Sequence, residues 1–236
     1  MIPKIFIILA CLFTLSVQAA KPLNVVLILV DDLGWMDLSC QGSRYFETPH
    51  IDRIAAEGMR FTDAYAACAV CSPTRAAVQT GRYPGRLGVT DWIRSRFQGG
   101  TIPADKKNPS GFSGGKRKFL VPKNALWMES EEVPIAELLK PAGYVPCHIG
   151  KWHLGADDWY PQKQGYDFNY GGCDYGQPPS YFDPFNQPKH RHAMIRGGIP
   201  HLPGRKPGQY LSDREAEEAV AFIEKHKDKP FFLNMD

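Results

Sequence analysis

The stretch NVVLILV at residues 24–30, which ends at Asp31 and Asp32, decides the fold class. It is an aliphatic run rich in β-branched side chains, without the polar alternation of a strand that has one face in water. We therefore predict a strand buried on both faces of a mostly parallel sheet. In open sheets of this kind ligands bind at the carboxyl ends of the strands, so the acidic pair marks a candidate site.

Helices and strands alternate after this first strand. Thr48 and Pro49 predict the N-cap and the first position of a short helix. Residues 60–67 predict a second strand, and Ser72 predicts the cap of a helix over residues 73–80. The helix-capping serine and threonine and the prolines beside them therefore favour a regular alternation of helices and strands.

The second half of the chain continues the alternation between two long loops. A helix over residues 133–139 and a strand over residues 144–149 are predicted first. Ser212 and Glu215 then predict a capping box at the start of a helix, and residues 230–235 predict a last buried strand. The pattern predicts an α/β fold in which helices flank a mostly parallel sheet. The loops would cover residues 91–130 and 155–209.

The first nineteen residues have the composition of a secretory signal peptide. Lys4 supplies a positive start, residues 5–15 form an apolar run, and residues 17–19 fit the small-residue rule for cleavage. The run is too short for a stable membrane anchor. It is also short for a lipoprotein acylation site at Cys11, so we expect an exported protein, periplasmic or secreted.

Charge and cysteine content narrow the possible partners. The 236-residue chain carries 28 Lys and Arg against 25 Asp and Glu, a net charge of +3. No basic run tracks a nucleic-acid backbone, so we expect no nucleic-acid partner. Five cysteines follow residue 19, and an odd number in an exported protein leaves at least one unpaired or chemically altered.

Cys71 begins the segment CSPTR, just before a predicted helix. Unpaired backbone N–H groups and the helix dipole favour an anion there. Arg75 lies one turn further along the same face, and its guanidinium suits a tetrahedral oxyanion. These residues indicate an anion-binding nucleophile site, although a buried cysteine before an ordinary helix would give the same pattern. Cys68 and Cys71 also form a C-x-x-C, which leaves a thiol-redox role open.

Two more polar groups follow predicted strands. Asp31 and Asp32 would repel each other and hold a proton unless a cation lay between them, and oxygen ligands suit Ca²⁺ or Mg²⁺. Lys151 and His153 are two residues apart on a segment expected to be extended, so both can face one site with Trp152 turned away. A lysine and a histidine beside an anion suit charge neutralisation and proton transfer.

Together these segments resemble the type I sulfatase family, which is arylsulfatase-like and part of the alkaline phosphatase superfamily. Residues 71–75 are similar to the Cys-x-Pro-x-Arg signature whose cysteine is oxidised to formylglycine. The segment GKWHLG at 150–155 matches the family's second signature, and residues 24–35 and 48–58 resemble its opening strand and first helix. The resemblance covers essentially all of the chain after the leader, although Gln79 stands where the family usually has an apolar residue.

The resemblance implies hydrolysis of sulfate esters by a formylglycine made from Cys71, which requires a formylglycine-generating maturation enzyme. It implies Ca²⁺, with Mg²⁺ as the alternative, bound by Asp31, Asp32 and the residue at position 71. Charge stabilisation would come from Arg75 and Lys151. The substrate would be a sulfated small molecule or glycan. The implied catalytic residues are Cys71, Arg75, Lys151 and His153, the last orienting or deprotonating the hydrated aldehyde.

The resemblance also implies a partial domain. Residues 1–19 would be the signal peptide, and residues 20–236 the N-terminal part of the catalytic domain. The family has a further histidine after the strand that begins here at Phe231, and later an Asp-Asn pair and another lysine, none of which lies within residues 1–236. The sequence leaves open whether such a fragment is active. It also leaves open a phosphonate or phosphate ester hydrolase of the same superfamily, or a non-catalytic exported remnant that binds glycans.

Overall fold

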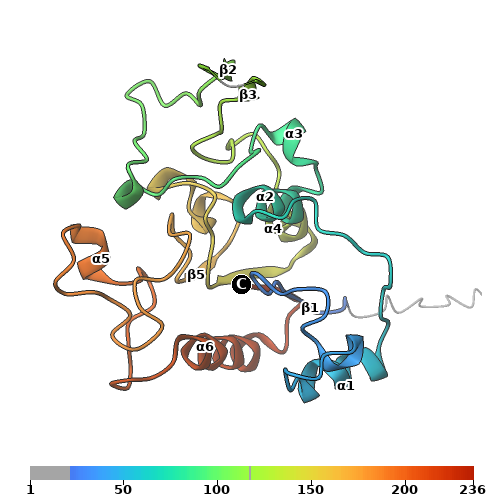
Figure 1. The fold of residues 1–236 in the computed structure, drawn as a ribbon. Coiled ribbons are helices and arrows are strands. Elements are labelled where there is room, and N and C mark those ends of the chain that lie inside the picture. The colour runs from blue at the N-terminus through green and yellow to red at the C-terminus, as the bar shows by residue number, and fades with distance from the viewer. Residues whose placement is uncertain (1–21, 117) are drawn as a thin grey trace, which may run out of the picture.

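A four-stranded parallel sheet forms the centre of the computed structural model, which describes residues 22–116 and 118–236 (Figure 1). The strand order is β1-β6-β4-β5, and all three neighbouring pairs are parallel. The α/β class with a mostly parallel sheet is therefore confirmed, whereas the proposed signal peptide lies outside the described residues. The strands are β1 (Val25–Ile28), β4 (Val145–Ile149), β5 (Phe168–Tyr170) and β6 (Phe231–Met235).

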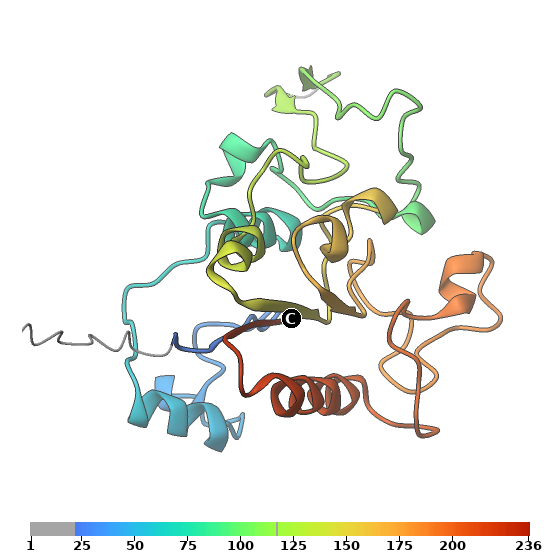
Figure 2. The ribbon, with the colours of Figure 1, turned by 180° about the vertical axis from the view of Figure 1, so that it is seen from behind.

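Helices cover both faces of this sheet (Figures 1 and 2). On one face α2 (Cys71–Thr80) and α4 (Ile135–Leu139) place Ala76 and Ala136 in one core cluster with Phe232. On the other face α6 (Leu211–His226) packs Phe222 against Phe231. Neighbouring residues of β6 thus face opposite helical layers, as the alternation of side chains along a strand requires.

The remaining elements are short and lie around this core. Figure 1 shows α1 beside β1 at one end, α5 at the other, and a small antiparallel hairpin of β2 and β3 above α3. Within the described residues no helix is long and apolar enough to span a bilayer. The elements are α1 (Pro49–Glu57), α3 (Pro84–Leu87), α5 (Ala193–Gly197), β2 (Phe112–Ser113) and β3 (Val121–Pro122). Single 3-10 turns occupy Ser39–Gln41, Arg96–Gln98, Lys140–Ala142, Asp157–Trp159 and Pro161–Lys163.

The first strand is shorter and less buried than its sequence predicts. Among the described residues β1 lies at the sheet edge and pairs with β6 alone. Val25 and Leu27 pack against the core, but Val26 and Ile28 are 48% and 57% exposed. The predicted burial on both faces is wrong for the described part of the chain, because nothing in it packs over the outer side of β1.

Three local predictions also fail. Residues 60–67 are exposed and form no strand, because they pair with no neighbouring strand of the described chain. α6 begins at Leu211 with Tyr210 as its N-cap and no side-chain cap, so the capping box of Ser212 and Glu215 does not form. β5 lies inside a segment predicted to be loop. The helix and strand predicted near residues 133–149 are confirmed, as is the last strand.

Candidate active site

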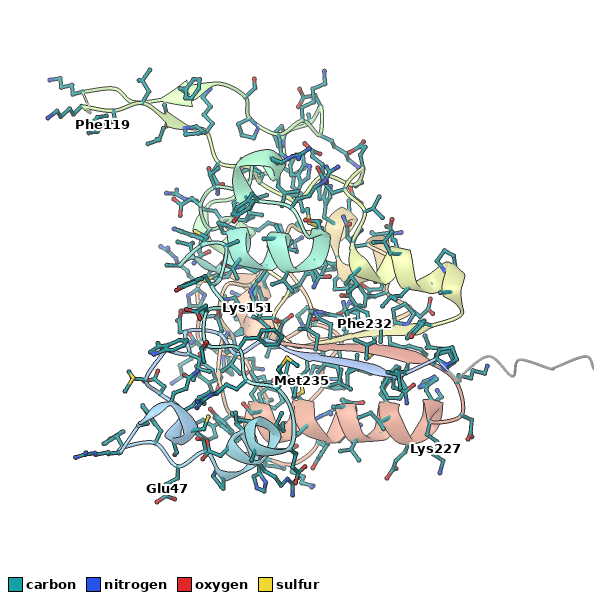
Figure 3. The ribbon with its side chains drawn as sticks, turned by 90° about the vertical axis from the view of Figure 1, so that its right-hand side faces the viewer. Glu47, Phe119, Lys151, Lys227, Phe232 and Met235 are labelled. Atoms are coloured by element: carbon teal, nitrogen blue, oxygen red, sulfur yellow. The ribbon has the colours of Figure 1, made fainter. Side chains whose placement is uncertain are left out.

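The carboxyl ends of three strands bring polar residues together at one edge of the sheet. Asp31 follows β1, Asp236 follows β6, and Lys151 follows β4. Figure 3 shows Lys151 at the same end of the sheet as Met235, while Phe232 lies further back along β6. The parallel arrangement explains this convergence, because all these strands end on the same side.

Arg75 links the three strand ends. Its side chain is only 3% exposed, and its Nη1 lies 3.0 Å from Asp236 Oδ1 while its Nη2 lies 3.3 Å from Asp31 Oδ1. Nη1 also donates a hydrogen bond of 2.8 Å to the Lys151 carbonyl. Among the described residues Nε has no acceptor and Nη2 makes only the 3.3 Å ion pair with Asp31, so the buried guanidinium retains donor capacity for a further anion.

Lys151 forms the second cationic contact with Asp31. Its Nζ donates to Asp31 Oδ2 at 2.6 Å. Partial burial acts to raise the pKa of Asp31, but the hydrogen bond and charge of Lys151, together with Arg75, hold this pKa below its ordinary value. Asp31 is therefore an ionised carboxylate with both oxygens directed at cations, and the expected proximity of Asp31, Arg75 and Lys151 is observed.

Cys71 is the first residue of α2, so the helix begins two residues earlier than the predicted start at residue 73. The N-cap is Val70, and no side chain caps the helix. Ser72, the predicted cap, instead donates from its hydroxyl to the His153 carbonyl and accepts from the Ile93 amide, both at 2.9 Å. The Ser72 hydroxyl thus connects the start of α2 to two distant segments. Cys71 is half-buried, and within the described residues its thiol forms neither a disulfide nor a hydrogen bond.

His153 is held as a neutral imidazole in one tautomer. Its Nε2 is 2.7 Å from the Ile93 carbonyl, which can only accept, so Nε2 carries the proton. Burial, with the charge of Lys151, lowers the pKa of His153 to about 4. Nδ1 is therefore the basic nitrogen, and it is buried without a partner in the described chain.

The backbone at His153 differs from the extended segment that the sequence predicts. Its φ is 58°, in the left-handed region, so Lys151 and His153 do not share one strand face. Lys151 reaches Asp31, whereas the His153 ring reaches Ile93. Trp152 is buried in the core between them, as predicted. Gly150 allows the backbone before Lys151 to pass close to Asp236. Its φ is +93°, and a Cβ at residue 150 would lie 1.9 Å from the Asp236 carbonyl oxygen.

A buried polar chain behind Arg75 was not anticipated from the sequence. Asn234 Nδ2 lies 2.9 Å from Asp236 Oδ2 and 2.8 Å from His148 Nδ1, and His148 Nε2 lies 3.2 Å from the Gly150 carbonyl. Burial raises the pKa of Asp236 to about 6, against the opposing charge of Arg75. Asp236 directly follows a predicted strand, so the rule that selects Asp31 could also have selected Asp236. His148 and Asn234 lie within predicted strands, and no sequence pattern marks them.

The donor set for a hard cation is present only in part. Asp31 and Asp32 follow the same strand and supply carboxylate oxygens, the ligand type that Ca²⁺ and Mg²⁺ prefer. The described residues contain no cluster of three or more His, Cys, Asp or Glu side chains suited to a metal. Ca²⁺ takes about six to eight oxygens, so these two carboxylates fit its chemistry but need further donors.

The fold and this site define a class: a parallel α/β protein with a helix-borne cysteine, a buried arginine and a lysine at the carboxyl edge of its sheet, suited to binding an anion. The family model described as Sulfatase matches residues 23–235. The chain belongs to the sulfatase family.

Curated relatives and solved structures agree with this assignment. N-acetylgalactosamine-6-sulfatase of Mus musculus is 36% identical over 241 residues, which cover 98% of this chain and 42% of the relative. Arylsulfatase A of Homo sapiens is 32% identical, covering 92% and 41%. The crystal structure of Ps i-CgsB superposes with a TM-score of 0.66 at 30% identity, covering 92% of this chain and 45% of that one. The chain thus spans less than half the length of each.

Proposed function

We propose that this chain is the N-terminal part of an enzyme that hydrolyses sulfate esters. The observation that carries the proposal is the placement of Arg75: it lies one turn after Cys71 on α2, it contacts Asp31, and it has buried N–H groups that make no hydrogen bond within the described residues. A sulfate oxygen beside Cys71 would satisfy such donors with charge-assisted hydrogen bonds. Membership of the sulfatase family supports the same reaction.

The residues of the chain have separate roles in this proposal. Arg75 and Lys151 stabilise negative charge that develops on the sulfuryl group, since both are fixed before substrate arrives. His153 accepts a proton at Nδ1, because Nε2 is committed to the Ile93 carbonyl. Asp31 holds both cations in place through its two oxygens.

Two chemical groups would complete the site. A formylglycine made from Cys71 by a maturation enzyme would supply, when hydrated, a hydroxyl nucleophile and a second hydroxyl whose proton loss releases sulfate. Asp31, Asp32 and the residue at position 71 would hold Ca²⁺, or Mg²⁺ in its place, with donors from beyond the described residues. The thiol of Cys71 at the first position of α2 supports this role, since it is partly accessible and forms no disulfide with another described cysteine.

The proposed substrate is a sulfated glycan or a small sulfate ester. The Mus musculus relative is named for a sulfated amino sugar, and Ps i-CgsB has a second crystal structure in complex with k-i-k-neocarrahexaose, with a TM-score of 0.64 to this chain. The leader-like residues 1–19 support export to the periplasm or the medium, with residues 20–236 as the first part of the catalytic domain.

Mass spectrometry and one assay test the proposal. The gene product is expressed with and without a formylglycine-generating enzyme, and the tryptic peptide that contains residue 71 is weighed. We expect conversion of the thiol to an aldehyde and hydrolysis of an aryl sulfate only in the converted protein, with an aryl phosphonate cleaved far more slowly. Sulfate release at full rate from protein that retains the Cys71 thiol would refute the proposal.

A further inference from the structure

Residues 92–95 present an aromatic ring and a guanidinium on one side of an extended segment. Ile93 and Ser95 are buried, whereas Trp92 and Arg94 are exposed, which is the alternation expected of extended backbone. Trp92 is 37% exposed, and Arg94 Cζ lies 5.5 Å from the centroid of its ring. The two side chains therefore form one cation–π pair at the surface.

This pair is joined directly to the candidate active site. The amide of Ile93, between the two exposed residues, donates to Ser72 Oγ at 2.9 Å, and Ser72 is the neighbour of Cys71. The carbonyl of Ile93 accepts from His153 Nε2 at 2.7 Å. The backbone of Ile93 thus bonds to the start of the nucleophile helix and to the proposed base, so Trp92 and Arg94 are the chain neighbours of a residue that contacts both.

The segment is also held rigidly from behind. Asn124 Oδ1 accepts from the amides of Thr90 and Asp91 at 3.1 and 3.0 Å. Its Nδ2 donates to the carbonyls of Asp91 and Trp92 at 3.0 and 2.9 Å. A ligand that contacts Trp92 would meet a preorganised surface, so little conformational entropy would be lost on binding.

Arg94 has a charge that the described chain does not neutralise. It takes part in no salt bridge within residues 22–116 and 118–236. Arg96, two residues on, is bound by Asp157 and Asp174 at 2.8 and 3.2 Å. Arg96 is therefore committed to the structure, whereas the guanidinium of Arg94 is available to an external anion.

We propose that Trp92 and Arg94 form a subsite for the sugar next to the sulfated one in an anionic oligosaccharide. Trp92 packs against the apolar face of that sugar, and Arg94 binds its carboxylate or second sulfate. The proposal rests on the proposed function, because it assumes that a sulfated sugar lies at Cys71. It narrows the substrate class to glycans with a second acidic group on the neighbouring residue.

Binding measurements on the unconverted, thiol-bearing gene product test the subsite without turnover. Calorimetry compares sulfated monosaccharides with sulfated disaccharides that carry a uronate on the neighbouring sugar. We expect at least one disaccharide to bind about tenfold more tightly than its own monosaccharide. W92A and R94A should each lose most of this tenfold gain, while W92F should keep much of it.

A second cation–π pair supplies the matched control. Lys118 Nζ lies 5.8 Å from the ring centroid of Phe119, which Figure 3 shows at the tip of the β2–β3 hairpin, away from Lys151. K118A and F119A should leave all affinities unchanged. The subsite is refuted if no disaccharide binds more tightly than its monosaccharide, or if W92A and R94A retain the full gain.

Turnover of a small aryl sulfate separates this proposal from the proposed function. An aryl sulfate is too small to reach the neighbouring sugar subsite, so W92A and R94A in converted protein should hydrolyse it within about twofold of the unaltered rate. A converted protein that cleaves no aryl sulfate would count against sulfate ester hydrolysis. The disaccharide affinities would still decide the subsite.

Discussion

Lys151 Nζ lies 2.6 Å from Asp31 Oδ2, although the strands that carry these residues are not neighbours. β6 lies between β1 and β4, and the Lys151 side chain passes over its carboxyl end to reach Asp31. Lys151 is 14% exposed and Asp31 is 39% exposed, so the ion pair faces the open edge of the sheet. In this position Lys151 can exchange Asp31 for a bound anion, and Asp31 can exchange Lys151 for a bound cation, without a change in the core.

Replacing Lys151 should reduce turnover much more than stability. K151M keeps most of the length of the side chain but removes the charge proposed to stabilise the sulfuryl group, so we expect kcat/KM for an aryl sulfate to fall about 10²–10³-fold. The melting temperature should change little, because the pair is partly exposed. K106A, which breaks the exposed pair with Asp158, is the control and should leave both quantities unchanged. Equal activity of K151M and K106A would contradict the role of Lys151.

Adding a methyl group at Gly176 should displace the His153 ring. A Cβ at residue 176 would lie 2.7 Å from His153 Cε1 and 3.0 Å from Nε2, too close for the ring to stay in place. The imidazole would lose its alignment on the Ile93 carbonyl, and we expect G176A to lower kcat by about tenfold or more with a smaller effect on KM. G197A is the matched control, since a Cβ there meets nothing within 4 Å.

The sequence predicts the site residues better than their local geometry. The proximity of Asp31 and Lys151 follows from residue type and from the rule that parallel strands end at one edge. The bond of Ser72 to the His153 carbonyl does not follow, because its partner is 81 positions away and a serine before a helix is ordinarily a cap. The left-handed backbone at His153 is equally hidden, since a non-glycine residue gives no signal for it.

The errors in the fold have a similar origin. A hydrophobic run predicts that a segment is buried, but it does not predict which other segment packs against it. Residues 24–30 predict burial on both faces, yet only one face of β1 packs within the described chain. Residues 60–67 have strand-like composition but no strand beside them to complete the hydrogen bonds. Strand pairing depends on partners that a local pattern does not contain.

Replacing Arg75 with lysine should be costly despite the retained charge. An ammonium group cannot reach Asp31, Asp236 and the Lys151 carbonyl together, as the planar fork does. Loss of even one charged hydrogen bond in this buried place costs about 2 kcal/mol, and we expect R75K to lower the free energy of unfolding by at least that amount. Urea unfolding measures this loss. R82K is the control: Arg82 is half exposed and pairs with Glu132, so R82K should lower the free energy of unfolding by about 0–1 kcal/mol.

The buried His148 should make the stability depend on pH in a defined direction. Burial lowers the pKa of His148 to about 3, whereas an unfolded histidine titrates near 6.5. Between these values the unfolded chain binds a proton that the folded chain does not, so the contribution of His148 is complete above pH 6.5 and is lost as the pH falls towards 3. The expected slope is about 1.4 kcal/mol per pH unit.

The slope of the whole protein does not isolate this effect, because burial raises the pKa of Glu215 to about 8 and that of Asp236 to about 6. Both carboxyls bind a proton more tightly in the folded state, so they stabilise it as the pH falls and oppose His148.

The test is therefore the difference in unfolding free energy between the unaltered chain and H148Q, measured by urea unfolding from pH 7 to pH 4. The difference should shrink by about 1.4 kcal/mol per unit below pH 6.5, since glutamine does not titrate. H50Q, at an exposed position on α1, controls for the substitution itself. A constant difference between H148Q and the unaltered chain across this range would show that His148 is protonated in the folded state, against its hydrogen bonds to Asn234 and Gly150.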